Sequence, residues 1–437
     1  MKVLIIDTDG VGLSLALRGR DAGHDVRWFV KPKPANSPDI GRGFKGITKV
    51  SNWVAHAGWA DLIFCTSNDD YLPKLDWFRE RGYPVFAPTQ QSAKLEISRR
   101  DGMKILEKAG IECAPYEVFP NMQAAERHVW KTGERYVFKT LGDNEDKSLT
   151  YVSKSPADLI AWIRRTPPPK GEVMLQKFIS GIEVGVSRFM GSKGWVGPWN
   201  ESFEHKKLMP GNYGPNTGEM GTVAYFTPES KLGKDTLGKL EEELLKRGHT
   251  GDTALGFIID DAGKAWPTEW TCRFGWPITN MMLGATKGDP ISWMKDALDG
   301  KDTTTFSTDI GCCLVLAHSD FPHDNADKSQ VSGVPIYGIT RGTAVHTHPQ
   351  AVQMMKLPDM TTDGRVKERE IWATAGSYVA VITGYGKDVK QATKRAYGTV
   401  EKLHVANPIV RDDVGETLRD QLPKLHALGY ALHCNYG

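Results

Sequence analysis

The first thirty residues constrain the fold more than any other part of the chain. An apolar run at residues 3–6 is followed by a glycine-containing turn at 7–12, helical spacing of apolar residues over 13–22 and a second strand-like run at 26–30. A continuous apolar run is typical of a parallel strand that is buried on both faces. A strand, a turn, a helix and a second strand in this order predict a doubly wound α/β sheet.

Two features near this unit bear on ligand binding. Gly10 and Gly12 resemble half of a dinucleotide-binding fingerprint, but no third glycine follows at the required spacing. A further apolar run at residues 61–65 ends in polar residues 66–70, at the sheet edge where open α/β folds bind ligands. A dehydrogenase on the first domain stays open as one hypothesis, and failure to bind NAD(H) would exclude it.

Composition excludes several classes of protein. The chain of 437 residues is too long for one hydrophobic core, and its formal charge of +2 gives no field that would attract nucleic acid or an anionic membrane. No apolar run approaches the roughly 20 residues of a membrane helix, and the N-terminus lacks a signal-peptide pattern. Six cysteines without a CxxC spacing predict a reduced cytoplasmic protein with buried thiols and no structural zinc.

The remaining pattern predicts three domains. The first ends near residue 90, after an edge strand at residues 84–88. Helices and strands alternate through residues 91–300, beginning with a helix over 90–110. Residues 305–437 are rich in β-like segments and contain an amphipathic helix near the end.

The least regular stretch is residues 213–222, which follows a basic run at 205–207. It holds three glycines, a proline, an asparagine and a threonine, and too few large apolar side chains for a core segment. Glycine allows positive φ and lets the backbone approach a ligand closely. A tight surface turn and a ligand-binding loop both remain open for this stretch.

Two charged side chains follow or lie on predicted strands. Lys139 ends an apolar strand and precedes a polar loop at residues 140–147, for which a solvated hairpin tip is the alternative. Glu269 lies on the second strand of a predicted hairpin, where its carboxylate could reach a metal ion. The alternative for Glu269 is a half-exposed acid on an ordinary hairpin.

These pieces, in this order, resemble glycinamide ribonucleotide synthetase (phosphoribosylamine–glycine ligase), an ATP-grasp enzyme, over nearly the whole chain. Residues 214–221 read GPNTGEMG where the family has GPNTGGMG. Residues 269–277, EWTCRFGWP, are similar to the family's EFNxRFGDP, and residues 95–99, LEISR, to its LEGSK. Stretches at 381–397 and 411–415 follow the family's C-terminal end.

The resemblance implies an α/β (α+β) chain with an ATP-grasp fold. It would have an N-terminal doubly wound parallel-sheet domain, a lid at about residues 114–180 within the second domain, and a C-terminal β-rich domain. The implied reaction uses ATP and Mg²⁺ (or Mn²⁺) to phosphorylate a carboxylate, after which an amine attacks the acyl phosphate to give an amide. In the family the acid is glycine, and the pathway is purine biosynthesis.

The resemblance also implies roles for single residues. The catalytic set over the phosphates and the acyl intermediate is Lys206, Asn216, Thr217, Gly218 and Arg273. The nucleotide-binding set is Arg99 and Lys139 at the phosphates, Gln176, Lys177, Phe178 and Ile179 at the adenine hinge, and Glu183 at the ribose. The metal ligands are Glu269 and Thr271.

The chain departs from the family in several of these motifs. Thr271 stands where the family has a metal-binding asparagine, and a hydroxyl is a weaker magnesium ligand. Trp276 and Ile278 replace the two acids of the family's RFGDPE, and Glu219 replaces a glycine of the loop. The loop after Lys139 has lost most of its small residues.

The departures are concentrated on the side of the amine substrate. The family's GGREHA and GPEAPL are replaced by residues 9–14 and 66–71. Asp69 and Asp70 in the second segment would repel a phosphorylated sugar and favour a cationic or hydroxyl-rich ligand, unless they belong to a solvated loop. The sequence therefore predicts that the nucleotide half is kept. For the amine, phosphoribosylamine and a different acceptor, such as a modified nucleotide, both remain open, and the departures favour the different acceptor.

Two functions follow from the resemblance. The first is a ligase that joins glycine or another small carboxylic acid to an amine, with no membrane or nucleic-acid partner and a monomeric or weakly dimeric state. The second is an ATP-grasp protein that has lost catalysis and serves as a nucleotide-binding regulator. The kept GPNTG stretch and Lys206 favour the first, because a binding protein needs no flap over an acyl phosphate.

Overall fold

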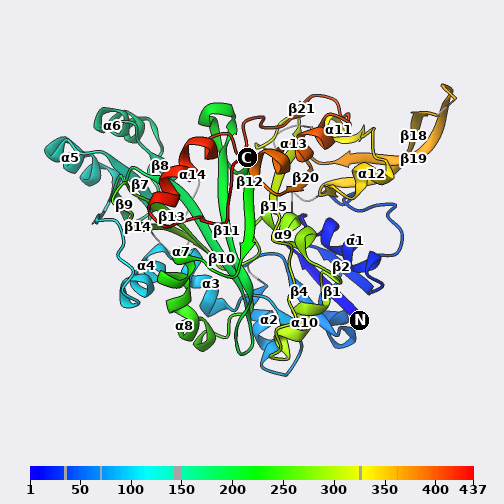
Figure 1. Ribbon diagram of the computed structural model, residues 1–437, viewed down its shortest axis with the longest axis horizontal. Coiled ribbons are helices and arrows are strands. Elements are labelled where there is room, and N and C mark those ends of the chain that lie inside the picture. The colour runs from blue at the N-terminus through cyan, green and yellow to red at the C-terminus, as the bar shows by residue number, and fades with distance from the viewer. Residues whose placement is uncertain (34–36, 69–70, 142–148, 324–326, 362) are drawn as a thin grey trace.

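The computed structural model describes residues 1–33, 37–68, 71–141, 149–323, 327–361 and 363–437. Its first domain is the predicted doubly wound sheet, with parallel strands in the order β3-β2-β1-β4-β5 (blue in Figure 1). The elements are β1 (Lys2–Asp7), α1 (Leu13–Asp21), β2 (Asp25–Val30), β3 (Thr48–Lys49), a 3₁₀ segment (Trp53–Trp59), β4 (Leu62–Cys65), α2 (Leu72–Arg79) and β5 (Val85–Phe86). The predicted edge strand is confirmed in β5.

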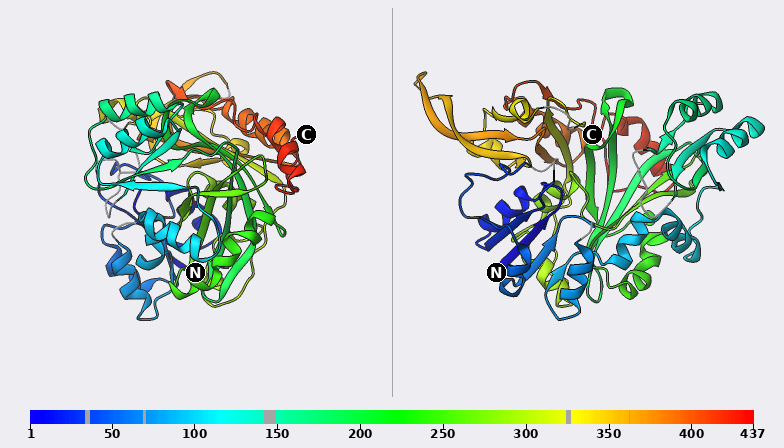
Figure 2. Two further views of the ribbon diagram at one scale, coloured as in Figure 1. Left: turned by 90° about the vertical axis from the view of Figure 1, so that its left-hand side faces the viewer. Right: turned by 180° about the vertical axis from the view of Figure 1, so that it is seen from behind.

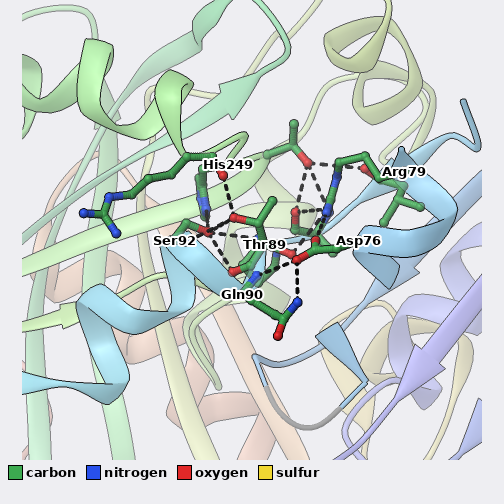
Figure 3. Close-up of polar contacts among 11 residues, drawn as sticks. Asp76, Arg79, Thr89, Gln90, Ser92 and His249 are labelled. Carbon is green, nitrogen blue, oxygen red and sulfur yellow. Dashed lines mark hydrogen bonds and ion pairs between the residues drawn. The ribbon is translucent and has the colours of Figure 1, made fainter. Parts of the chain in front are cut away.

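Partly and fully buried polar side chains lie where this domain meets the next one (Figure 3). Asp76 pairs with Arg79, and its Oδ2 accepts a hydrogen bond from the N–H of Gln90 (2.9 Å). Ser92 Oγ lies 2.9 Å from Nδ1 of His249. Burial lowers the pKa of His249 to about 4, so the ring is neutral near pH 7. The neutral ring holds its hydrogen-bond partner Ser92 in place.

The helix that the sequence predicts over residues 90–110 is two helices. These are α3 (Gln90–Ile97) and α4 (Arg99–Lys108). Ser98 between them has an extended backbone, and its hydroxyl accepts from the N–H of Asp101 as an N-cap. A serine competes with the helix for local hydrogen bonds, which is why the apolar periodicity alone did not reveal the break.

The predicted lid is a small sheet with its own core (left in Figure 1). Its strands β6 (Tyr116–Phe119), β7 (Tyr136–Thr140), β8 (Tyr151–Val152) and β9 (Val173–Lys177) are ordered β6-β9-β7-β8. Helices α5 (Met122–Thr132) and α6 (Pro156–Arg165) bury apolar side chains against it. Most of the polar loop predicted after Lys139 lies outside the described residues.

A large antiparallel sheet organises the rest of the chain. Its path is β14-β13-β10-β11-β12-β15-β20-β17, and β21 pairs with β15. The strands are β10 (Ile182–Gly191), β11 (Gly194–Met209), β12 (Tyr213–Thr227), β13 (Gly251–Ile259), β14 (Ala265–Thr271), β15 (Ile310–His318), β17 (Thr347–Pro349), β20 (Tyr378–Gly386) and β21 (Pro408–Ile409). The sheet runs from the middle of the chain into its C-terminal part, so the division into three domains stays a prediction.

The glycine-rich stretch is strand rather than loop, which corrects one prediction. It forms the start of β12, and the hairpin turn lies just before it at Pro210–Asn212, where Gly211 and Asn212 have φ of +66° and +59°. A β-carbon added to Gly221 would lie 2.8 Å from the carbonyl oxygen of Cys313 and from Cγ2 of Val414. Glycine is needed there for close packing, not for flexibility.

Helices and a smaller sheet cover the remaining surface (Figures 1 and 2). The small sheet is ordered β16-β19-β18, from β16 (Ser332–Pro335), β18 (Val352–Met360) and β19 (Val366–Ala375). The helices are α7 (Lys231–Asp235), a 3₁₀ turn (Leu237–Leu240), α8 (Glu241–Lys246), α9 (Ile278–Ala285), α10 (Ser292–Leu298), α11 (Lys328–Val331), α12 (Arg341–Ala344), α13 (Val389–Val400) and α14 (Leu418–Ala427). Within the described ranges, none of the helices combines the length and apolar character of a membrane span.

Candidate active site

Lys206 on β11 lies at the centre of a group of carboxylates from three strands. Its Nζ is 2.7 Å from Glu183 Oε1 on β10, 2.8 Å from Glu269 Oε1 on β14 and 3.3 Å from Glu204 Oε2 on β11. Side chains two residues apart on a strand face the same side, which places Glu204 beside Lys206. The structure thus brings three of the predicted site residues together and adds Glu204, which the sequence did not single out.

Negative charge exceeds positive charge in this group, which we call the Lys206 cluster. Burial lowers the pKa of Lys206, but the carboxylates of Glu204, Glu269 and Glu183 outweigh burial and hold this pKa well above its ordinary value. Burial also raises the pKa of Glu204, and it raises the pKa of nearby Glu219 to well above the ordinary value. The Glu219 side chain is 8% exposed, and its Oε1 has no hydrogen-bond partner among the described residues. The cluster would gain from a further cation.

Lys139 lies in a buried position on the lid sheet. Its Nζ donates to Gln176 Oε1 (2.7 Å) and to the carbonyl of Thr268 (3.5 Å), the residue before Glu269. Burial, reinforced by the positive charge of Arg99, lowers the pKa of Lys139 to about 8. Arg99 in turn donates to Thr150 Oγ1 (2.9 Å). Two cations therefore stand near one another at the base of the lid, an arrangement suited to an anionic ligand such as a phosphate chain.

The predicted adenine hinge joins the lid to β10. The N–H of Lys177 donates to the carbonyl of Pro115 (2.8 Å), and the N–H of Phe178 donates to that of Arg135 (3.2 Å). The Arg135 guanidinium lies 3.4 Å from the ring centroid of Phe178. Both N–H groups already donate hydrogen bonds within the protein. Hydrogen bonds between this backbone and an adenine base would therefore have to involve its carbonyl groups or Ile179.

The residues of the glycine-rich strand lie close to the Lys206 cluster. Thr217 Oγ1 donates to the carbonyl of Lys206 (2.8 Å), and Asn216 is the pairing partner of Lys207 across the hairpin. A β-carbon on Gly218 would meet no atom within 4 Å, so this position is open. On β14, Thr271 follows Glu269 by two residues and faces the same side of the strand.

Arg273 belongs to the side of the site that faces the first domain. Its Nε lies 3.3 Å from Glu96 Oε1, and this carboxylate raises the pKa of Arg273. Glu96 Oε2 also accepts from Asn68 Nδ2 (2.8 Å) and from the N–H of Cys272 (2.7 Å). Glu96 thereby fixes Arg273 at the junction of the two domains.

Asp7 is a further residue that the sequence did not identify. It is fully buried at the end of β1, and its carboxylate accepts from the N–H groups of Gly12 (2.7 Å), Val11 (3.1 Å) and Asp9 (3.3 Å) and from Trp28 Nε1 (3.2 Å). Burial raises the pKa of Asp7, while the hydrogen bonds from Gly12 and Val11 oppose this effect. The carboxylate fills the turn that opens α1. The pattern that could have identified Asp7 is an acidic residue directly after an apolar run of strand-forming residues.

Comparisons with known proteins agree with this geometry. Residues 99–277 match the family model described as "Phosphoribosylglycinamide synthetase, ATP-grasp (A) domain". Phosphoribosylamine–glycine ligase of Salmonella typhimurium is 25% identical over 440 residues, which cover 95% of this chain and 98% of the relative. The corresponding protein of Neisseria meningitidis serogroup B is 27% identical over 361 residues, covering 78% and 80%.

Solved structures show the same fold. The crystal structure of phosphoribosylamine–glycine ligase from Thermotoga maritima has a TM-score of 0.68 at 20% identity and covers 95% of this chain and 100% of that one. N5-carboxyaminoimidazole ribonucleotide synthetase from the same organism has a TM-score of 0.57 at 15% identity, with coverage of 93% and 100%. This chain has the ATP-grasp fold and resembles phosphoribosylamine–glycine ligase. The likenesses indicate a C–N ligase of that type.

The metal site expected of an ATP-grasp ligase fits the donors of the Lys206 cluster in chemistry. Carboxylate oxygens are the ligands that Mg²⁺ and Mn²⁺ prefer. Within the described residues, however, no group of three or more His, Cys, Asp or Glu side chains is arranged to hold a metal ion. The carboxylates of Glu183 and Glu269 are drawn to the Lys206 ammonium instead. Glu269, with Thr271, therefore stays the predicted metal-binding pair.

Two residues predicted on the side of the amine substrate are not among those that the structure describes. Asp69 and Asp70, expected to repel a phosphorylated sugar, lie outside the described residues. Trp276, which replaces a family acid, donates from Nε1 to the carbonyl of Thr66 (3.3 Å). The indole of Trp276 thus links the residues after Arg273 to the end of β4, at a position where the family has an acidic side chain.

Lys139→Ala is expected to raise the apparent KM for ATP about tenfold or more, since a lost charged contact costs ~1.4 kcal/mol or above. In the wild type, ATP affinity should fall as the pH rises through about 8, because Lys139 loses its proton there. ATP binding above this pH should take up a proton, which calorimetry in buffers of different ionisation enthalpy measures. Lys131→Ala, an exposed lysine in the last turn of α5, is the control. An unchanged KM in Lys139→Ala would place the phosphates elsewhere.

Proposed function

We propose that this chain uses ATP and Mg²⁺ to join glycine, or another small carboxylic acid, to an amine other than phosphoribosylamine. The Lys206 cluster supports the reaction type, since an ammonium and several carboxylates meet beside the glycine-rich strand and the lid. Asp7 supports the change of amine, and it is the observation that carries the proposal.

Asp7 lies at the carboxyl end of β1, the edge of the first sheet at which open α/β folds bind ligands. Free N–H groups at a helix N-terminus favour anions such as phosphates. Here the N–H groups of Val11 and Gly12 are already bonded to the Asp7 carboxylate, and Asp9 adds a second negative charge that pairs with Lys33 (2.7 Å). A sugar phosphate would therefore find these two N–H groups already taken, whereas an amine without a phosphate would not need them.

The proposed reaction has two steps. The carboxylate oxygen of the acid attacks the γ-phosphorus of ATP, so that a P–O bond forms and the bond to ADP breaks. The amine nitrogen then attacks the acyl carbon, phosphate leaves with its C–O bond electrons, and the nitrogen loses a proton. Bound Mg²⁺ would neutralise phosphate charge and orient the phosphates.

Residues of this chain would position and shield the reactants. Lys139 and Arg99 would bind phosphate oxygens, and Glu183 the ribose hydroxyls. Lys206 would neutralise charge on the transferred group, provided that its contacts to Glu183 and Glu269 loosen when the nucleotide enters. Arg273, held by Glu96, would orient the acid at the junction with the first domain. Water has to be excluded because an acyl phosphate hydrolyses readily.

The test is ADP release with ATP, Mg²⁺, glycine and a panel of amines. The panel contains phosphoribosylamine, sugar amines without phosphate, and aliphatic diamines. We expect amine-dependent ADP release with a member that lacks phosphate and little with phosphoribosylamine. Faster turnover with phosphoribosylamine than with any other amine would contradict the change of substrate. No amine-dependent release across the panel would contradict the ligase itself.

A nucleotide-binding protein without catalysis is the second candidate. The contact from Trp276 to the first domain favours it, because a family acid has been replaced by a structural side chain. Calorimetry of ATP binding with and without Mg²⁺ separates the two candidates. Tight binding together with no turnover on any acid would support the second one.

A further inference from the structure

A cavity lies between the first domain and the C-terminal part of the chain. Its volume is about 740 Å³, and its walls come from α1, residues 43–45, residues 288–290 and residues 344–349, with β18 and β19. Strand β17 packs against α1 at this junction, and Figure 1 shows α1 below α12 and the β18–β19 hairpin. This size suits a small metabolite. Lys139, Lys206 and Glu269 are not among its lining residues.

Arg18 of α1 lines this cavity with its charge uncompensated. Its Nη2 donates to the carbonyl of Asn280 (3.3 Å) and to Nδ1 of His348 (3.1 Å), while its Nε is buried without a partner. No ion pair joins Arg18 to a carboxylate in the part of the chain that the structure describes. Burial lowers the pKa of Arg18, and Tyr385 and then Asp21 only partly offset this effect.

His348 does not supply the missing negative charge. Since arginine can only donate, Nδ1 of His348 accepts, and Nε2 carries the proton and donates to Thr383 Oγ1 (2.8 Å). Burial, followed by the nearby Arg18, holds the pKa of His348 well below its ordinary value, so the ring is neutral. A largely buried guanidinium beside a neutral ring is unfavourable unless an anion joins it.

A second buried donor beside the same wall also lacks an acceptor. Asn280 is 1% exposed, and its Oδ1 accepts from the hydroxyl of Ser14 (2.6 Å), a residue that lines the cavity. Its Nδ2 has no hydrogen-bond partner within the described ranges. Arg18, which lines the cavity, and Asn280, whose carbonyl it contacts, therefore each keep one buried donor without an acceptor among the described residues.

The opposite side of the cavity is apolar and aromatic. Phe44 and Trp372 line it and contact each other edge to face, with ring centroids 5.8 Å apart. Of the other charged side chains in the lining, Arg20 pairs with Asp21 (2.7 Å), and the exposed Lys45 and Glu370 carry one charge of each sign. The cavity thus combines one guanidinium that has no carboxylate partner among the described residues with an aromatic wall.

We propose that this cavity binds a small organic anion, with a carboxylate or phosphate held by Arg18 and a flat apolar ring packed on Phe44 and Trp372. Such a ligand would bridge α1 and the C-terminal hairpin. The proposal does not depend on the proposed ligase function, because none of its residues belongs to the Lys206 cluster or to the lid.

Calorimetric titration with benzoate and with phenyl phosphate tests the proposal, and benzyl alcohol serves as the uncharged control. We expect at least one of the two anions to bind, with benzyl alcohol much weaker. Arg18→Gln should weaken anion binding about tenfold or more, the size of a lost charged hydrogen bond. Arg20→Gln, which removes a cation already paired with Asp21, should leave it nearly unchanged. Inorganic phosphate alone should bind more weakly than phenyl phosphate if the aromatic wall contributes.

The thermal stability of Arg18→Gln provides a second readout. Removing an uncompensated buried charge should leave the melting temperature of the free protein unchanged or raise it, whereas a purely structural arginine would lower it. Binding that survives in Arg18→Gln, or that disappears in Lys139→Ala, would place the anion elsewhere and overturn the proposal. Absence of binding by both anions at millimolar concentration would overturn it as well.

Discussion

Glu269→Gln is expected to lower magnesium-dependent turnover by about 100-fold or more, because even the outer partners of a metal site cost 10–100-fold in metal affinity when they are changed. Glu269 is the predicted metal-binding carboxylate, and glutamine keeps its size while removing its charge. The measurement is ADP release as a function of Mg²⁺ and Mn²⁺ concentration. Saturation should shift to higher metal concentration, and the maximal rate should also fall.

The fold should tolerate this change. Lys206 keeps its contacts with Glu183 (2.7 Å) and Glu204 (3.3 Å), so the melting temperature without metal is expected to stay close to that of the wild type. Glu172→Gln is the matched control, since Glu172 is an exposed acid that pairs with Arg100 (2.7 Å) away from the cluster. Normal turnover and normal metal dependence in Glu269→Gln would remove the metal assignment.

Much of the fold could be predicted because its signals are local. The apolar run at residues 3–6 and the helical spacing after it become β1 and α1, and the predicted edge strand at 84–88 becomes β5. The prediction failed where tertiary pairing decides the structure. Residues 213–222 read as a loop, yet they pair with β11 along a hairpin that no local pattern announces. Pairing satisfies their backbone and overrides the weak strand propensity of glycine and proline.

The site could be predicted less completely than the fold. The resemblance to the family assigned roles to Lys206, Glu183 and Glu269, and the structure brings these three side chains together. It did not find Glu204 or Asp7, whose roles depend on which side of a strand they face and on what is buried around them. The positions of the glutamates in the sequence do not reveal that carboxylates from three strands contact one ammonium group.

Arg411 illustrates the same limit in the C-terminal part. The sequence placed it in a stretch that follows the family, without a role. In the structure it is 1% exposed, pairs with Asp413 (2.5 Å) and donates to the carbonyl of Lys207 (3.0 Å) and to Asn212 Oδ1 (2.9 Å). It thereby anchors the β11–β12 hairpin, and with it the position of the Lys206 cluster, to a segment two hundred residues later in the chain.

Lys206→Met is expected to destabilise the protein when no divalent cation is present. Glu183, Glu204 and Glu269 would then face one another without the ammonium that lies 2.7–3.3 Å from them. The side chains of this group are partly exposed, so solvent screens part of the repulsion. A loss of ~1–2 kcal/mol corresponds to a melting temperature lower by about 2–6 °C in EDTA. Lys207→Met, which changes the neighbouring lysine, is the control.

Adding Mg²⁺ or Mn²⁺ should show whether Lys206→Met is less stable because the ammonium occupies the position of a metal ion. If the ammonium and a metal ion compete for the same carboxylates, the variant without the ammonium should bind the metal more tightly in the absence of nucleotide. Its melting temperature should then rise more on metal addition than that of the wild type. Turnover should stay low even with metal, because Lys206 can no longer neutralise the transferred phosphoryl group. Equal stabilisation of the two proteins by metal would show that Lys206 does not occupy the metal position, and the carboxylates would then serve mainly to hold Lys206 in place.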